Sequence, residues 1–343
     1  MGKEIFNHFV IKHMNVVQKA YKIFWPVFII IFVAVTIVVG KIIFDSFYPA
    51  ISSGYKPTLI LPKFSGEPNK ISDAERYGYI ISDEIWSGEI RVTGDIIVPK
   101  GVTLTIKPGT TVLVDANSDK ENLMTLSFWK KDGLYLGEGR DQYIHQGEPY
   151  RNEPNHITIW VAGTLYAVAT DDEKIVIKSN SQNPGRYDWN TLHIENGIIS
   201  YAEIRDYRAM DLGTGSKLTN SELHNVGECP ICISDSENIL IDSNWVHDSG
   251  HEIVDNTRSS PTIINNHFGP SPQFLNPGGH TAGWGGLIVG SGFPTIKGNV
   301  IEGFNDAVSF FDKASYDVLA DGVIKNNTFK DNIENVVLNL NPD

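Results

Sequence analysis

Cysteine is scarce in this chain, with only Cys229 and Cys232 among 343 residues. So few thiols exclude a disulfide-rich scaffold and any zinc module built on four thiolates. Positive charge is also in short supply, because 28 basic residues stand against 41 acidic ones. Affinity for phosphate backbones comes mainly from clustered Lys and Arg. The composition therefore predicts no nucleic-acid partner.

One long apolar run occurs, from Ile23 to Gly40, and it contains no charged residue. With Lys41 extending toward the interface, the run reaches Phe44 and covers a hydrocarbon core of about 30 Å. A cleaved signal peptide and a buried core helix are the alternatives, but a signal peptide has a shorter apolar segment and a cleavage site of small residues. We therefore predict a single transmembrane signal anchor over residues 23–45.

The charges that flank this run predict its orientation. Residues 1–46 contain five lysines and two acidic residues, whereas the remainder of the chain is strongly acidic. By the positive-inside tendency, residues 1–22 stay in the cytoplasm and the rest is exported. Residues 46–75 contain four prolines and no clear period, which is typical of an extended linker. The protein is thus expected in the cell membrane, with its functional part outside.

Convincing amphipathic helical periods are lacking after Tyr79, where short β-rich runs alternate with turn residues. Instead a hexad of the form apolar-x-[N/S/G/Y]-[N/S/A]-x-apolar recurs. The six hexads are Ile199–Ile204, Leu218–Leu223, Ile241–Val246, Ile263–Phe268, Ile296–Ile301 and Ile324–Phe329. A second short apolar run follows each of them. Two short strands in a period of about twenty residues predict coils that stack on one another.

The polar pair inside each hexad is expected to turn a corner between two strands. Asparagine suits this corner because it tolerates left-handed backbone geometry and because stacked Asn side chains hydrogen-bond along a stack. The corner asparagines are Asn220, Asn244, Asn265, Asn266, Asn299, Asn326 and Asn327. The prediction is an all-β domain over residues 76–343, a single-stranded parallel β-helix with insertions at 115–155 and 269–286. Its first hexad residues, Ile324 included, would form one interior file.

Two segments resemble a known family. Trp86-Ser-Gly88 with Gly94–Thr110 looks like the opening coils of surface-exposed right-handed parallel β-helix proteins, and Val161–Leu165 continues that pattern. The later Asn-rich coils are similar to the pectate-lyase-like repeat. The resemblance implies a right-handed solenoid outside a microbial cell. It implies no particular activity, because this fold hosts lyases, glycosidases, epimerases, adhesins and proteins without known activity.

Alignment of the hexads brings titratable residues of neighbouring coils together. His224 and His247 become stacked neighbours, with Asp206 and Asp248 beside them. Imidazoles next to carboxylates are suited to acid–base catalysis, which makes these four the catalytic candidates. The alternative is that they are solvated corner residues of an acidic solenoid.

Metal binding and redox chemistry are weaker expectations. His247, His251 and Asp255 are the candidate metal ligands, and Ca²⁺ is the one cofactor considered, although no cofactor motif is evident. The Cys229-Pro-Ile-Cys232 pair resembles a redox motif. That chemistry uses a helix N-terminus, however, and none is predicted here. An exported location favours a local disulfide, with two free thiols as the alternative.

The two insertions are the candidate ligand-binding segments, because long loops on a rigid scaffold often bind ligands and aromatic faces stack on sugar rings. Their candidate residues are Trp129, Tyr135, Tyr143, Phe274, His280 and Trp284. The alternative is that these aromatics pack back onto the solenoid.

No segment matches a catalytic motif closely. The sequence therefore predicts a membrane-anchored, outward-facing β-helix that serves as a cell-surface scaffold or as a module binding glycans or envelope proteins. The alternative is a polysaccharide lyase or glycoside hydrolase that acts on envelope or extracellular glycans.

Overall fold

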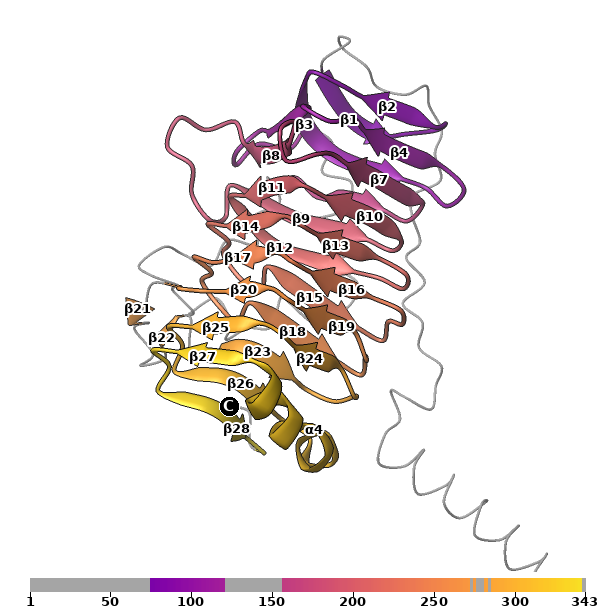
Figure 1. The fold of residues 1–343 in the computed structure, drawn as a ribbon. Helices are drawn as coiled ribbons and strands as arrows, with labels where there is room; N and C mark the ends of the chain where they lie inside the picture. Colours follow the sequence, from indigo (N-terminus) through magenta and orange to yellow (C-terminus); the bar gives the residue numbers. More distant parts are fainter. Residues whose placement is uncertain (1–74, 121–155, 272–273, 276–280, 283–284, 341–343) are drawn as a thin grey trace, which may run out of the picture. The chain divides into compact units, whose positions relative to one another are not determined.

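The computed structural model of the chain describes residues 75–120, 156–271, 274–275, 281–282 and 285–340, all within the compact unit Pro62–Asp343. In this unit the chain winds into successive coils, and the coils build three ladders of parallel strands (Figure 1). Each strand inside a ladder hydrogen-bonds to the coils above and below, about 4.8 Å away. The predicted stack of β-coils is therefore confirmed.

The first ladder is a separate eight-stranded sheet that contains the first residues of the hexads. Its strands are β2 (Glu84–Trp86), β4 (Thr103–Ile106), β7 (Thr164–Val168), β10 (Gly197–Ser200), β13 (Lys217–Thr219), β16 (Leu240–Asp242), β19 (Thr262–Ile264) and β24 (Thr295–Lys297).

The second ladder contains the ends of the hexads. It begins with the first half of β3 (Glu89–Val98) and continues through β5 (Thr111–Val114), β8 (Ile175–Ser179), β11 (Ala202–Arg205), β14 (Glu222–His224), β17 (Trp245–Val246), β20 (His267–Phe268), β25 (Val300–Glu302) and β27 (Thr328–Lys330).

The third ladder contains the second apolar run of each coil. It begins with the second half of β3 and continues through β6 (Ile159–Val161), β9 (Trp189–Ile194), β12 (Tyr207–Leu212), β15 (Ile231–Ser234), β18 (Val254–Thr257), β23 (Gly285–Val289), β26 (Asp306–Phe310) and β28 (Glu334–Leu338). Strand β1 (Glu75–Tyr79) pairs with both halves of β3, and β21 (Phe274–Leu275) forms an antiparallel pair with β22 (Thr281–Ala282).

The first apolar residues of five hexads form a continuous interior file, as predicted. They pair one to the next, coil after coil, and all are buried: Ile199, Leu218, Ile241, Ile263 and Ile296. Burying each aliphatic side chain contributes about 1.5–3 kcal/mol relative to leaving it in water. The hexad pattern therefore specifies this file of the core.

A ladder of asparagine side chains lies at the corner between the first and second ladders. The Nδ2 group of Asn244 donates to Oδ1 of Asn266 at 2.9 Å, Asn266 donates to Asn299 at 3.0 Å, and Asn299 donates to Asn327 at 2.9 Å. Each Oδ1 atom also accepts the backbone N–H of the asparagine in the preceding coil. The neighbouring Asn220 and Asn265 have φ values of 50° and 57°. Both predicted roles are thus confirmed for these asparagines, whereas Asn326 lies in a helix, Lys313–Asn326.

The last hexad departs from the predicted pattern. Residues Lys313–Asn326 form helix α4, which contacts β24 and β28, and no strand of the first ladder follows β24 in the described chain. Asp312 caps the helix by accepting the Ser315 backbone N–H. Ile324 therefore lies on the helix with 51% of its surface exposed, so the prediction that it joins the interior file is wrong. The helix was not predicted because its sequence lacks a convincing amphipathic period, and only Ser315, Ala320 and Val323 are buried along it.

Among residues 75–340, apart from the gaps named above, no helix has the length and apolar character needed to cross a bilayer. The predicted anchor at 23–45, the cytoplasmic segment 1–22 and the linker up to residue 74 lie outside the described residues.

Candidate functional site

A row of polar and aromatic side chains lies on the outer face of the second ladder. Glu203, Glu222, Trp245 and His267 pair in register along β11, β14, β17 and β20. Three further members each lie two residues after such a position in their own coils: His224, His247 and Glu302. We refer to these seven residues as the strip. The hexad alignment predicted the register of the strip.

One diagonal contact repeats along the strip, because a side chain of one coil reaches the position two residues farther on in the next coil. Three contacts pair a histidine with a carboxylate: His224 Nε2 with Glu203 Oε1 at 3.4 Å, His247 Nε2 with Glu222 Oε1 at 3.3 Å, and His267 Nε2 with Glu302 Oε1 at 2.9 Å. The fourth has the same direction, since Trp245 Nε1 donates to the carbonyl of Gly269 at 3.2 Å. The strip therefore consists of polar contacts that each join two neighbouring coils.

The rings of the strip also stack. The imidazoles of His224 and His247 are nearly parallel, with centroids 5.2 Å apart and planes inclined by 5°. The Trp245 ring lies 4.0 Å from that of His247 and 6.2 Å from that of His267. In the next coil, the position that follows His247 in the row is Gly269. The indole N–H of Trp245 donates to the carbonyl of this glycine.

Partial burial sets the charge of the strip. Burial lowers the pKa of His247, and this outweighs the opposing effect of its hydrogen bond to Glu222. The pKa of Glu203 is lowered, chiefly by its hydrogen bond to His224. At neutral pH His247 is therefore neutral beside a carboxylate, and Glu203 is ionised. Trp245 remains 43% exposed, so the network is accessible from solvent.

The two aspartates among the catalytic candidates are held by other partners. Asp206 is fully buried, where its carboxylate accepts from the Ser179 backbone N–H at 3.1 Å and from Asn225 Nδ2 at 2.7 Å. Asp248 forms an ion pair with Arg186, which belongs to the loop between β8 and β9. These contacts give both carboxylates a role in joining coils.

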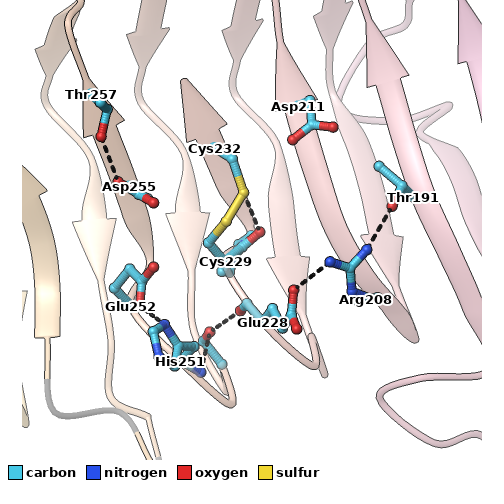
Figure 2. Close-up of a disulfide and its surroundings, with 12 residues drawn as sticks. Thr191, Arg208, Asp211, Glu228, Cys229, Cys232, His251, Glu252, Asp255 and Thr257 are labelled. Carbon is cyan, nitrogen blue, oxygen red and sulfur yellow. Dashed lines mark hydrogen bonds and ion pairs between the residues drawn. A yellow bond between two sulfur atoms is a disulfide. The ribbon is translucent and has the colours of Figure 1, made fainter. Parts of the chain in front are cut away.

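The parallel rings of His224 and His247 limit what the pair can do. The nitrogen lone pairs of two nearly parallel imidazoles, with ring centroids 5.2 Å apart, lie in nearly parallel planes, whereas a shared metal ion needs two nitrogens to converge at about 2.0 Å. His251 instead pairs with Glu252, and Asp255 accepts a hydrogen bond from Thr257 (Figure 2). Across the described parts of the chain, no group of three His, Cys, Asp or Glu side chains has the arrangement to hold a metal ion.

The two cysteines form a disulfide on the outer face of the third ladder (Figure 2). Cys232 lies in register between Asp211 on β12 and Asp255 on β18. Next to it, the buried Arg208 forms an ion pair with Glu228 at 2.9 Å. The local disulfide was one of the two expected alternatives, and the structure has it. The Arg208–Glu228 pair was not anticipated, since the hexad alignment does not cover these positions.

The predicted ligand-binding aromatics belong to the two insertions, not to the strip. Trp129, Tyr135, Tyr143, His280 and Trp284 lie outside the described residues, and only the backbone of Phe274, in β21, is described. The flanking strands do locate both insertions, however. One leaves after β5 and returns before β6, and the other leaves after β20 and returns before β23. Both therefore begin at the edge of the second ladder that leads to the third ladder.

Trp245, Glu222 and Glu302 belong to no local motif and were not among the predicted site residues. The hexad register could have located Trp245, because it places this outward-facing residue, two positions before His247, next to the histidine pair. The diagonal contacts join residues of different coils, so no local sequence motif predicts them.

Comparison with known proteins supports the fold. A family model described as "Right handed beta helix region" matches residues 211–340, from the end of β12 through β28. Together with the parallel ladders, this match identifies the coil stack as a right-handed parallel β-helix. The curated proteins gave no match, and neither did the solved structures.

Proposed function

We propose that this protein is a non-catalytic, glycan-binding β-helix whose binding surface is the strip. The observation on which the proposal depends is the solvent-accessible network of Glu203, Glu222, Trp245 and the histidines on consecutive coils. Carboxylates, imidazoles and an indole are the groups that bind sugar hydroxyls and sugar rings. A rigid stack of coils holds them in fixed positions.

The contacts within the strip favour binding over catalysis. Acid–base cleavage needs two titratable groups that converge on one reacting bond. His224 and His247 are parallel, Asp206 is buried, and Asp248 is paired with Arg186. These side chains are thus arranged along the surface, which supports recognition of a chain-like ligand.

We also propose a location for this activity. The apolar segment 23–45 would anchor the protein in the cell membrane, and the β-helix would meet extracellular or envelope glycans outside. An envelope protein is the other class of partner compatible with an exposed strip.

A glycan panel tests the proposed function directly. Purified full-length protein is applied to immobilised neutral, basic and acidic glycans, beside the variants Trp245→Ala and Glu222→Ala. Tyr166→Ala is the matched control, because Tyr166 on β7 is a comparably exposed aromatic residue (46% against 43% for Trp245) on the first ladder.

We expect binding of at least one glycan that both strip variants lose and the control retains. Equal binding by Trp245→Ala and wild type would contradict the proposal. Release of unsaturated or reducing sugar ends that His247→Ala abolishes would instead establish the lyase or hydrolase alternative.

A further inference from the structure

The strip repeats with the coils, and this period restricts the ligand. We propose that the strip binds an extended, uncharged β-1,4-linked polysaccharide that runs parallel to the stacking axis, with one sugar unit against each coil. This inference rests on the proposed glycan-binding function and specifies its ligand class.

The repeat distance is the first argument. The strip occupies five consecutive strands of the second ladder, β11, β14, β17, β20 and β25. Four steps of about 4.8 Å give it a length of about 19 Å. An extended β-1,4-linked chain advances by about the length of one pyranose ring per sugar, which is similar to one coil step. A ligand aligned with the axis can therefore place one sugar unit against each coil.

The hydrogen-bonding groups are the second argument. Glu203 and Glu222 each use Oε1 to bind a histidine, so each carboxylate has a second oxygen that can accept a sugar hydroxyl. The Trp245 ring is stacked against two imidazoles, and its N–H is bonded to the Gly269 carbonyl. Recognition therefore depends on hydrogen bonds and ring edges that recur along the row. A single stacked sugar would not use this repeat.

The charge of the strip is the third argument. Glu203 and Glu222 lie directly opposite each other in adjacent strands, where like charges repel. Arg205 and Lys330, at the two ends, balance only part of the carboxylate charge. A polyuronate would bring one further carboxylate to every coil, close to these glutamates. The strip therefore disfavours acidic polysaccharides and favours uncharged ones.

The dependence of affinity on the length of the oligosaccharide tests this inference most directly. Calorimetric titration of the full-length protein with cellobiose through cellohexaose should give an affinity that rises about two- to tenfold per added sugar, up to five sugars, and then levels off. Malto-oligosaccharides of the same length, which coil because of their α-1,4 linkages, should not show this rise. Oligogalacturonates should bind at least tenfold more weakly than cello-oligosaccharides.

Variants locate the ligand along the axis. Glu203→Gln, at one end of the strip, should lower the chain length at which affinity levels off by one sugar, whereas Glu222→Gln, inside the strip, should weaken every chain of three or more sugars. Tyr166→Ala should leave the series unchanged, and equal thermal midpoints will confirm that all variants are folded.

Two failures are distinguishable. If no glycan of any series binds, the proposed function is overturned and this inference with it. If a glycan binds but its affinity is independent of chain length, or if oligogalacturonate binds as well as the cello-series, only the inference is overturned.

Discussion

The imidazole of His247 lies parallel to that of His224 in the preceding coil and directs its Nε2 atom to Glu222, two residues before His224. One side chain thus joins two coils twice, by stacking and by a hydrogen bond. His224 makes the same diagonal contact with Glu203, one coil farther up. The strip is therefore part of the interaction between coils as well as an exposed surface.

This position of His247 makes stability depend on pH. Its folded-state pKa is lowered by burial, so below the ordinary value of about 6.5 the unfolded chain binds a proton that the folded chain resists. Stability is complete above that pH and falls as the pH drops through it. We expect the urea midpoint of wild type to decrease more between pH 7.5 and pH 5.5 than that of His247→Gln.

The lower limit of pH 5.5 is chosen because of Glu203. Its lowered pKa keeps it ionised at that pH, so its own loss of stability begins only at more acidic values. An equal decrease for wild type and His247→Gln would contradict the assigned role of His247.

Much of the fold can be predicted from the sequence, because each hexad indicates which residues are buried and where the chain turns a corner. Apolar ends predicted the interior file from Ile199 to Ile296, and the asparagines predicted the corner ladder. The error at Ile324 has a physical cause. Its hexad matches the pattern, but the final coil has no further coil below it in the described chain, and there a helix covers the end of the first ladder.

The asparagine ladder makes a strong stability prediction. Asn266 accepts from the backbone and side chain of Asn244 and donates to Asn299 and to the Ile241 carbonyl. Asn266→Ala removes these four buried hydrogen bonds, at about 1 kcal/mol each, so we expect a loss of about 3–5 kcal/mol in urea unfolding. The exposed neighbour Asn265 is the control. Asn265→Gly keeps its left-handed backbone and should change stability by less than about 1 kcal/mol.

The helix at the last coil predicts unequal effects of the same substitution in two hexads. Ile263→Ala removes a side chain that is 1% exposed and should destabilise the protein by about 2–5 kcal/mol. Ile324→Ala, on the outer surface of α4, should change stability by less than about 0.5 kcal/mol. Comparable losses of stability for the two variants in thermal or urea unfolding would show that Ile324 belongs to the interior file after all.

The candidate site was less predictable than the fold. The hexad register alone brings His224 next to His247, because both residues have the same offset from their hexads. The partner of each histidine could not be inferred, since Glu203 and Glu222 lie in other coils and the tilt of the side chains selects the diagonal neighbour. The indole N–H of Trp245 bonds to the carbonyl of Gly269 in the next coil, a contact that a single-coil motif does not reveal.

The disulfide on the third ladder leads to a prediction about stability and one about reactivity. Cys229 and Cys232 are three residues apart, and closing so short a loop contributes about 2 kcal/mol. The Cys229→Ser/Cys232→Ser double variant should be destabilised by that amount, and reduced wild type should match it. A clear difference in unfolding free energy between the double variant and reduced wild type would contradict a purely structural role of the disulfide.

The carboxylates beside Cys232 should slow the reduction of the disulfide by negatively charged thiols. Asp211 and Asp255 lie in register on the two neighbouring strands, so an attacking thiolate meets negative charge on both sides. At equal thiolate concentration and low salt, cysteamine, which carries an ammonium group, should therefore reduce the disulfide faster than glutathione does. Asp255→Asn should narrow this ratio, and Asp171→Asn, at a distant exposed site, should not. Equal rates for the two thiols, measured by trapping free cysteines, would show that the flanking carboxylates do not protect the bond.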